Sequence, residues 1–175
     1  MAHPEQAQYV KSIKSRFPRY FTDVKVLDIG SLDVNGNNRG LFLSSDYTGI
    51  DVGNGRNVDA VSKGHEWDVP HDTYDTIIST ECFEHDKFFS LTVRNVVRML
   101  KPGGMFVFTC ATTGRHEHGT NNVDPGASPL TSNLAEFEDH YKNITEEDVR
   151  SAINVDAVFS EYEFMVNGPD LYFYG

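Results

Sequence analysis

The sequence predicts an α/β fold with a doubly wound, mostly parallel sheet that ends in an antiparallel hairpin. Two observations support this prediction. Short apolar runs alternate along the chain with amphipathic or turn-rich segments, which is typical of strands joined by crossover connections. The last two apolar runs, at residues 158–166 and 170–174, are separated only by Asn167, Gly168 and Pro169, and so short a connection favours a hairpin.

The N-terminal segment, residues 1–23, is expected to be helical and to end near Pro18, because its apolar residues recur at intervals of one, three and four. Residues 39–43 support only a short helical piece. Apolar runs bounded by turn residues then predict a series of strands. These strands are expected at residues 24–29, 47–51, 58–61 and 74–80.

A second amphipathic helix is expected over residues 88–100, where apolar side chains recur at helical spacing. The following Lys-Pro-Gly-Gly, at residues 101–104, is typical of a helix exit turn. A strand at residues 105–110 comes directly after it. Strand, helix, turn and strand in this order indicate one parallel crossover unit.

Residues 111–139 follow no regular pattern and form the longest expected loop. Loops of this length in a compact domain are often functional lids. This one begins at the carboxyl end of a strand, where open α/β sheets bind their ligands. We therefore expect a single domain over residues 1–175, with residues 111–139 as a loop or lid on the substrate side. A short helix beginning after Thr145 completes the prediction.

Composition excludes several classes of protein. The formal net charge of −11 disfavours nucleic acid as a partner, since such binding needs clustered Lys and Arg. No apolar run is long enough for a membrane span, and no secretory signal precedes the first helix. Cys82 and Cys110 both lie in apolar segments, as packed, reduced thiols do. A cytoplasmic location is therefore expected.

The segment Val26 to Gly36, which reads VLDIGSLDVNG, indicates a nucleotide-like ligand at the end of the first strand. A dinucleotide would require the pattern G-x-G-x-x-G, and only Gly30 is present here. Asp33 would also bring negative charge to a diphosphate. S-adenosylmethionine has no phosphate and carries a cationic sulfonium and ammonium, so carboxylates such as Asp28 and Asp51 would attract it.

At this point the sequence resembles the class I S-adenosylmethionine-dependent methyltransferases, in their small single-domain, type 11-like branch. The resemblance rests on DIG followed by YTGID, YDTIISTECFEH and LKPGGMFVFT in that order. The glycine loop has the form G-S-x-x-x-N-G-x-x-R, with Gly30, Ser31 and Arg39 among its matched positions, whereas Leu32 replaces a glycine that many relatives carry. The resemblance implies a seven-stranded Rossmann-like sheet with an antiparallel C-terminal hairpin.

The resemblance also implies which residues form the sites. Asp51 would hold the ribose hydroxyls of S-adenosylmethionine, and Glu81 would lie near its methionine end. The expected cofactor-binding residues are Asp28, Gly30, Ser31, Asp51, Val52, Gly64, His65, Glu66 and Glu81. On the acceptor side the segment around TGRHEHGT resembles a run in relatives, so His118, His116 and His85 are candidates for the base, with Arg115 and Tyr141 holding the substrate.

The predicted function is S-adenosylmethionine-dependent O-methylation of a small-molecule or sugar-type acceptor. The alternative is a cofactor-binding but catalytically inactive partner protein. A metal site formed by His116, Glu117 and His118 with His140 was weighed and is not expected, because no Cys or further carboxylate lies at a diagnostic spacing. A homodimer, paired through the sheet edge or the first helix, is an open expectation.

Overall fold

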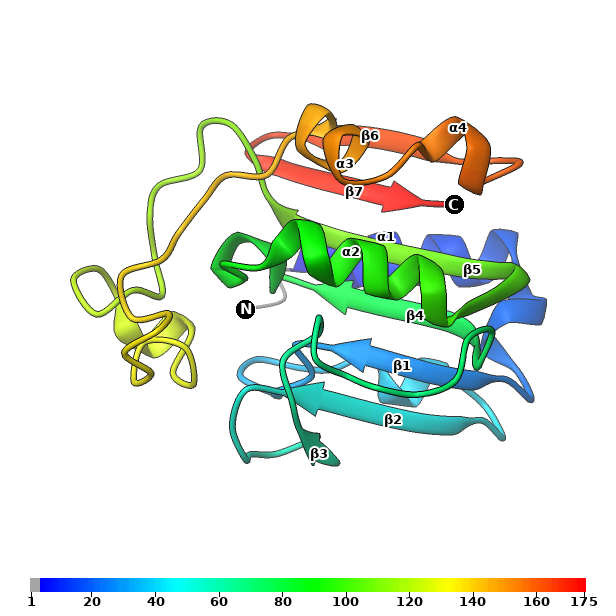
Figure 1. Ribbon diagram of the computed structural model, residues 1–175, viewed down its shortest axis with the longest axis horizontal. Helices are drawn as coiled ribbons and strands as arrows, with labels where there is room; N and C mark the ends of the chain where they lie inside the picture. Colours follow the sequence, from blue (N-terminus) through cyan, green and yellow to red (C-terminus); the bar gives the residue numbers. More distant parts are fainter. Residues whose placement is uncertain (1–3) are drawn as a thin grey trace.

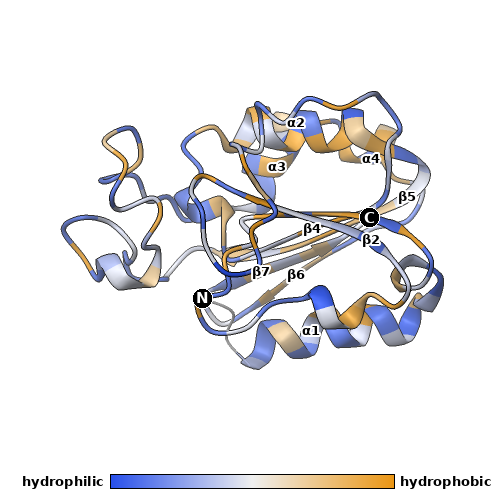
Figure 2. Cartoon of the chain, turned by 90° about the horizontal axis from the view of Figure 1, so that it is seen from below, coloured by the Kyte–Doolittle hydropathy of each residue, from blue (hydrophilic) through white to orange (hydrophobic). Residues whose placement is uncertain are grey.

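The computed structural model describes residues 4–175, which form three layers with one central sheet. Helix α1, Pro4–Arg16, covers one face of the sheet, and α2, α3 and α4 cover the other (Figures 1 and 2). The two short helices α3 and α4 span Glu146–Ala152 and Val155–Val158, and α2 spans Phe89–Met99. Helices on both faces of the sheet agree with the doubly wound prediction.

The sheet has seven strands in the order β3-β2-β1-β4-β5-β7-β6. Strands β1 to β5 run parallel to one another, whereas β7 is antiparallel to both β5 and β6. The fold class predicted from the sequence, including the antiparallel C-terminal hairpin, is therefore confirmed. The strands are β1 Lys25–Ile29, β2 Asp46–Asp51, β3 Ala60–Val61, β4 Tyr74–Thr80, β5 Leu100–Ala111, β6 Glu163–Asn167 and β7 Asp170–Tyr174.

The first helix ends earlier than the periodicity predicts. Helix α1 stops at Arg16, and Pro18 opens a separate 3-10 turn, η1, over Pro18–Phe21. Proline lacks the backbone N–H that a continuing helix needs, so the chain restarts at this residue. Further short 3-10 turns are η2 Arg39–Leu41, η3 Phe83–His85 and η4 Pro125–Ala127.

Two strand predictions need correction. The strand expected at 158–166 begins only at Glu163, because Asn154 caps the short helix α4 by accepting from the backbone N–H of Ala157 at 3.2 Å. The fifth strand is longer than expected and starts at Leu100, which pairs with Tyr74 before the register shifts. The turn expected at residues 101–104 therefore lies inside this strand, where Gly103 has a φ of 74°.

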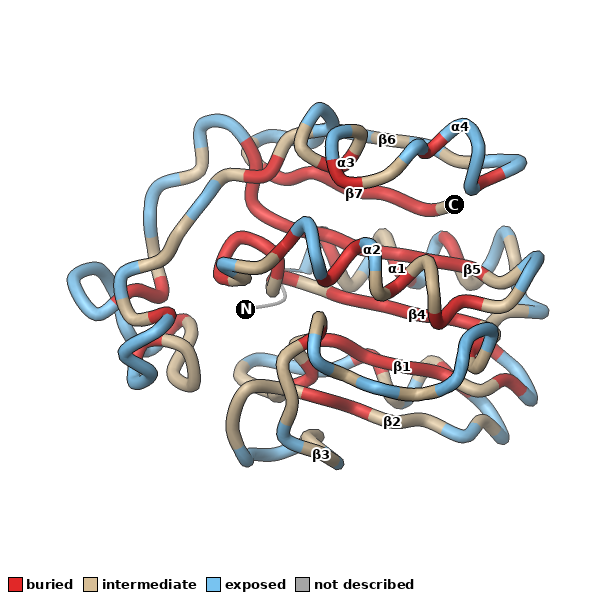
Figure 3. The backbone as a smooth tube through the Cα atoms, in the orientation of Figure 1, coloured by how far each residue is buried: buried red, intermediate tan, exposed pale blue. Residues whose placement is uncertain are grey.

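Each face of the sheet has its own apolar cluster. On the side of α2 and α3, the rings of Phe106, Phe108 and Phe173 lie together, with centroids 5.1 to 5.8 Å apart. On the side of α1, Val26 and Val107 are among the residues that pack against the helix. Figure 3 shows the central strands as buried and much of the projecting 111–139 segment as exposed. The rigid part of the molecule is thus the sheet itself.

Residues 111–139, here called the lid, contain no α-helix and no strand beyond the end of β5. The lid projects past the carboxyl ends of the parallel strands (Figure 1). The segment therefore lies at the carboxyl edge of the parallel strands, and its place on the substrate side stays a prediction. Within residues 4–175 no helix combines the length and apolar character that crossing a bilayer would require.

Helix α3 depends on a capping box formed by Thr145 and Asp148. The Thr145 hydroxyl oxygen accepts from the Asp148 backbone N–H at 3.3 Å, and Asp148 Oδ2 accepts from the Thr145 N–H at 2.9 Å. We expect Thr145→Ala to lower the free energy of unfolding by about 1 kcal/mol, because the cap is lost. Urea denaturation measures this. Thr145→Ser keeps the hydroxyl and serves as the control; equal stability of T145A and T145S would contradict the prediction.

Candidate functional site

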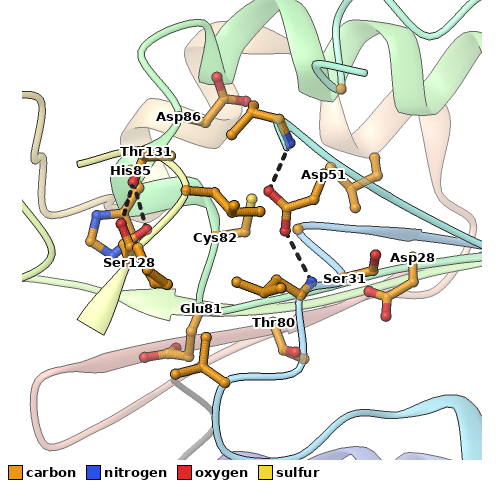
Figure 4. Close-up of a pocket in the computed structure, with 18 of the residues that line it drawn as sticks. Asp28, Ser31, Asp51, Thr80, Glu81, Cys82, His85, Asp86, Ser128 and Thr131 are labelled. Carbon is orange, nitrogen blue, oxygen red and sulfur yellow. Dashed lines mark hydrogen bonds between the residues drawn. The ribbon is translucent and has the colours of Figure 1, made fainter. Parts of the chain in front are cut away.

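A cavity opens at the carboxyl ends of β1, β2 and β4 and is closed on its outer side by part of the lid. About 910 Å³ of space lies between its walls, counting the open solvent at its mouth. Figure 4 shows the carboxylates of Asp28, Asp51 and Glu81 arranged around it, each from the end of a different strand. The site is therefore built by the sheet and completed by the lid.

Asp28 is buried at the end of β1, with 2% of its surface exposed. The Tyr47 hydroxyl donates to its Oδ2 at 2.5 Å, while Oδ1 is buried and has no hydrogen-bond partner in the part of the chain that the structure describes. Burial raises the pKa of this carboxyl to about 7, against the lowering effect of the Tyr47 hydrogen bond. The neighbouring charge of Asp51 acts in the same direction as burial. A cation in the cavity would stabilise the ionised form.

Gly30 lies at the cavity, as the sequence predicts, and it also allows a close contact with the chain after β4. It lines the cavity and has a φ of 78°, but the space where a Cβ would lie is filled by Cys82, whose Cβ is 2.4 Å from that position. The close approach that requires glycine is therefore made by the end of β4. Ser31 is fixed from the other side, because its carbonyl accepts from Asn57 Nδ2 at 2.8 Å.

Asp51 lies at the end of β2 and holds the glycine loop in place. Its Oδ2 accepts from the Leu32 backbone N–H at 3.0 Å, and its Oδ1 accepts from the Val52 N–H at 2.7 Å (Figure 4). A carboxylate oxygen has two lone pairs, so each retains capacity for a ligand hydroxyl. The substitution of glycine by leucine at position 32 is accommodated because the side chain packs beside Gly55, outside this hydrogen bond.

The loop after Ser31 turns back without forming an α-helix before β2. Asp33 closes this loop, since its carboxylate accepts from the Gly36 N–H at 2.7 Å and from Asn37 Nδ2 at 2.8 Å. The hydrogen bond from Asn37 is the main cause that lowers the pKa of Asp33, so the group is ionised. A diphosphate site needs a helix N-terminus after the first strand, and this loop supplies a carboxylate instead.

Arg39 connects the glycine loop to the far side of the cavity, a role that the sequence motif did not reveal. Its guanidinium donates to Asn57 Oδ1 at 2.7 Å and pairs with Asp59 at 2.5 Å. It also lies over the ring of Tyr47, with its Cζ 4.4 Å from the ring centroid. Arg39 thereby positions the tyrosine that donates to Asp28. The arginine was visible in the sequence, but its partners are distant in the chain.

Of the expected cofactor-binding residues in the turn after β3, Gly64 lines the cavity, whereas His65 and Glu66 do not. The turn that follows β3 directs the His65 ring onto Phe88, with centroids 4.3 Å apart. Glu66 is exposed and pairs with Lys63 at 3.3 Å. Val52 and Gly64, two of the expected cofactor-binding residues, therefore line the cavity. The side chains of His65 and Glu66 lie outside it.

Glu81 follows β4 and has a φ of 53°, in the left-handed region that few non-glycine residues adopt. It is buried in the cavity wall, and its Oε2 has no hydrogen-bond partner within residues 4–175. Burial, reinforced by the charge of Glu84, raises the pKa of this carboxyl well above its usual value. Strained backbone at a buried acid that faces a cavity is a feature of ligand sites.

The lid reaches the cavity through residues 127–131 and Phe137. Leu130 lies directly over Gly53, and a Cβ on that glycine would approach the Leu130 Cδ2 to 2.9 Å. Glu136 forms an ion pair of 2.6 Å with Lys63 on the cavity wall. These two contacts close the lid over the end of β2.

The histidines expected on the acceptor side separate into two groups. His85 lines the cavity, and its ring lies 5.1 Å from that of His118, centroid to centroid, with Tyr141 5.0 Å from His118. His116 is exposed and reaches this group only through its carbonyl. Arg115 does not line the cavity but pairs with Asp170 at 3.1 Å. The structure thus brings together His85, His118 and Tyr141.

His85 is buried next to the cavity, and burial lowers the pKa of its imidazole to about 3. The imidazole is therefore neutral at physiological pH, as an acceptor of protons or a ligand of a metal must be. The residues weighed in the sequence as a metal site do not converge, because Glu117 instead accepts from Thr120 at 2.8 Å. Glu84, which the sequence analysis did not select as a ligand, lies within reach of His85 and His118.

Comparisons with known proteins agree with this architecture. A family model described as a methyltransferase domain matches residues 1–150. No curated protein matches the chain. Among solved structures, phosphoethanolamine N-methyltransferase 2 of Haemonchus contortus, crystallised with S-adenosyl-L-methionine, is similar with a TM-score of 0.61 and 20% identity, over 90% of this chain and 38% of that one.

Two further solved structures are similar over most of the chain. A putative sarcosine dimethylglycine methyltransferase from Galdieria sulphuraria has a TM-score of 0.61 and 16% identity, over 91% of this chain and 64% of that one. The [4+2]-cyclase SpnF has a TM-score of 0.63 and 13% identity, over 97% and 67%. The chain therefore spans less than two thirds of the length of both methyltransferases. At these identities the likeness shows the fold.

The raised pKa of Asp28 predicts a dependence of stability on pH. Between about pH 4 and pH 7 the folded protein keeps a proton on Asp28 that the unfolded chain releases, so this group lowers the free energy of unfolding as pH rises, by about 4 kcal/mol at most. Above about pH 7 the effect is constant. We expect Asp28→Asn to gain stability relative to the parent across this pH interval.

Urea denaturation of both proteins at a series of pH values measures the difference. Asp68, whose side chain is 97% exposed, provides the matched control Asp68→Asn, which should follow the parent at every pH. A constant difference between D28N and the parent from acid to neutral pH would contradict a raised pKa at Asp28.

Proposed function

Because the chain belongs to the methyltransferase domain family, we propose that it binds S-adenosylmethionine in the cavity at the ends of β1, β2 and β4 and transfers the methyl group to a hydroxyl of a small-molecule or sugar-type acceptor. The observation that carries this proposal is the set of carboxyl groups around the cavity, which a cationic ligand would hold in the ionised form. Asp28, Asp51, Glu81 and Asp86 line the cavity, and the cation among the lining residues, Lys63, is paired with Glu136.

Such a wall favours a cationic ligand over an anionic one. The sulfonium and ammonium of S-adenosylmethionine gain from carboxylates at short range, whereas a diphosphate would be repelled. Asp51 suits the ribose, since its two oxygens are already oriented by backbone donors and can accept from vicinal hydroxyls. Asp28 and Glu81, each with a buried oxygen that lacks a partner, suit the cationic amino acid end.

The acceptor side is formed by His85, with His118 and Tyr141 behind it. Methyl transfer from a sulfonium is an in-line displacement, so the protein has to align the acceptor, exclude water and assist removal of its proton. The lid excludes water by closing over the cavity. The His85 imidazole, whose pKa is lowered by burial, is the group at the inner end of the cavity that assists an oxygen acceptor, with His118 beside it.

A small acceptor fits the available space better than a polymer. The cavity has to hold the cofactor as well, and the lid covers its outer side. The net charge of −11 disfavours nucleic acid. The phosphoethanolamine methyltransferase named above acts on a small molecule according to its name, which supports the size of the acceptor but not its chemistry.

The other candidate is a protein that binds the cofactor without transferring a methyl group. The likeness to a [4+2]-cyclase illustrates that one fold serves different reactions. Turnover decides between the two candidates. Cofactor binding without methylation of any sugar, phenol or hydroxy acid would favour the non-transferring protein.

Cofactor choice is tested by calorimetric titration of the parent with S-adenosylmethionine, S-adenosylhomocysteine and NAD. We expect both adenosyl compounds to bind and NAD not to. Asp51→Asn should lower the affinity for S-adenosylmethionine by about ten-fold to a hundred-fold, because hydrogen bonds to a charged group contribute roughly 1.5–3 kcal/mol each. Asp68→Asn is the control and should bind like the parent. Binding of NAD alone would reverse the assignment.

The acceptor side is tested by following formation of S-adenosylhomocysteine with a panel of sugars, phenols and hydroxy acids. We expect His118→Ala to lower turnover of a responsive acceptor by about a hundred-fold or more. Its affinity for S-adenosylmethionine should stay close to that of the parent, because His118 does not line the cavity. Undiminished turnover in H118A with cofactor bound would exclude an assisting role for this histidine.

A further inference from the structure

We propose that Glu84, His85 and His118 form a binding site for one divalent transition-metal ion at the inner end of the cavity. Each residue offers one ligand atom, and the three atoms lie within 4.8 Å of one another. Two ligands come from the turn η3 that follows β4, and the third comes from the lid. The site therefore joins the sheet to the segment that covers it.

The first argument is the state of the buried ligand atoms. Glu84 is completely buried, and 4% of His85 is exposed. Glu84 Oε2 and His85 Nδ1 have no hydrogen-bond partner among the described residues. Buried polar atoms are nearly always satisfied, because leaving them without a partner is costly. A cation between them would satisfy both.

The second argument is the orientation of Glu84. Its Oε1 accepts from the backbone N–H of Ala111 at 3.3 Å, and its backbone carbonyl accepts from the N–H of Lys142 at 2.9 Å. One oxygen of the carboxylate is thus tied to the end of β5, and the other is left for a ligand. Orientation of a ligating carboxylate by such a hydrogen bond is usual at metal sites.

The third argument is the tautomer of His118. Its Nδ1 lies 3.0 Å from the carbonyl oxygen of His116. A carbonyl only accepts, so Nδ1 carries the proton and the lone pair is on Nε2. Donation from one ring nitrogen to a carbonyl, with the other ring nitrogen as the metal ligand, is the common arrangement of metal-bound histidine. The rings of His85 and His118 also pack against Tyr141.

The donor set indicates the kind of ion. Two imidazoles and one carboxylate suit Zn²⁺ and its first-row neighbours, whereas Mg²⁺ and Ca²⁺ prefer oxygen alone. Three protein ligands leave at least one coordination position open, as in catalytic sites. Ligand atoms about 2.1 Å from a tetrahedral ion lie roughly 3.4 Å apart, so binding has to draw the ligands together. His118 is partly exposed on the lid and can make this movement.

The consequence for catalysis rests on the proposed function, whereas binding of the ion does not. His85 lines the cavity next to Glu81 and Cys82, so the open position would be available to an acceptor hydroxyl. The ion would lower the pKa of that hydroxyl, which then loses its proton to water. The oxygen forms a bond with the methyl carbon, the carbon–sulfur bond breaks, and its electron pair stays on sulfur in S-adenosylhomocysteine.

Metal binding is tested with untagged protein that has been stripped by a chelator and then titrated with Zn²⁺ against a chromophoric competitor. We expect one ion per chain in the parent. Removal of an outer hydrogen-bond partner typically weakens metal sites by about 10-fold to 100-fold, so Glu84→Gln and His118→Ala should lose at least that much. His116→Ala should bind like the parent, because the exposed ring is absent from the cluster and the carbonyl remains.

Far-ultraviolet circular dichroism and the unfolding midpoint of each stripped variant identify any loss of fold, and Glu84→Gln keeps the oxygen that accepts from Ala111. Equal Zn²⁺ affinity in the parent, E84Q and H118A would overturn the site. So would an absence of stoichiometric Zn²⁺ binding in a parent that binds S-adenosylmethionine, and that result would leave the proposed function intact. Stoichiometric Zn²⁺ without S-adenosylmethionine binding would support the site and overturn the proposed function.

Discussion

The site depends on the contact between the ends of β1 and β4. Gly30 and Cys82 meet so closely that no side chain fits at position 30, and this contact sets the glycine loop against the floor of the cavity. The Asp51 carboxylate holds the same loop from the β2 side through the Leu32 N–H. Two strand ends therefore fix one loop, and the parallel order of β2, β1 and β4 brings three carboxylates to one edge. A larger residue at position 30 would separate these strand ends before it affected any ligand.

Around this contact, residues distant in the chain act together. Arg39 links Tyr47 to Asn57 and Asp59, and Tyr47 in turn donates to Asp28. The loop after β1 is thus held by side chains in place of the helix that usually follows a first strand of this fold. The loop therefore offers no helix N-terminus to a phosphate, and Asp33, which accepts from the Gly36 N–H, adds a carboxylate to the loop instead.

Much of the fold could be predicted from the sequence because the strand signals are local. Residues 74–80 form a strand with the predicted bounds, and the capped helix after Thr145 and the final hairpin are present as expected. The errors arose where local signals compete. The apolar residues near Val158 fit a strand, but Asn154 caps a short helix there. Likewise, the strand that begins at Leu100 is set by pairing with Tyr74, which lies far away in the sequence.

The candidate site was predictable to the extent that its residues follow strand ends. Asp28 and Asp51 are predicted from their places at strand ends and Glu81 from resemblance to relatives, and all three line the cavity. His65 and Glu66 were assigned by resemblance, and a turn directs their side chains elsewhere. Glu84 was passed over because its neighbourhood depends on the path of the lid, which no sequence pattern specifies. The separation of His116 from His118 could not be predicted either, because an irregular loop has no repeating pattern that says which side chains point in the same direction.

Two contacts hold the outer edge of the lid: an ion pair between Lys63 and Glu136, both partly exposed, and the packing of Leu130 against Gly53. Exposed ion pairs contribute about 1 kcal/mol or less, so these lid contacts are weak compared with the contacts within the sheet. The cavity also has a mouth that is open to solvent. For a ligand too large for that mouth, the frequency with which these lid contacts break sets an upper limit on how often the pocket can exchange its contents, independently of the speed of whatever chemistry occurs inside.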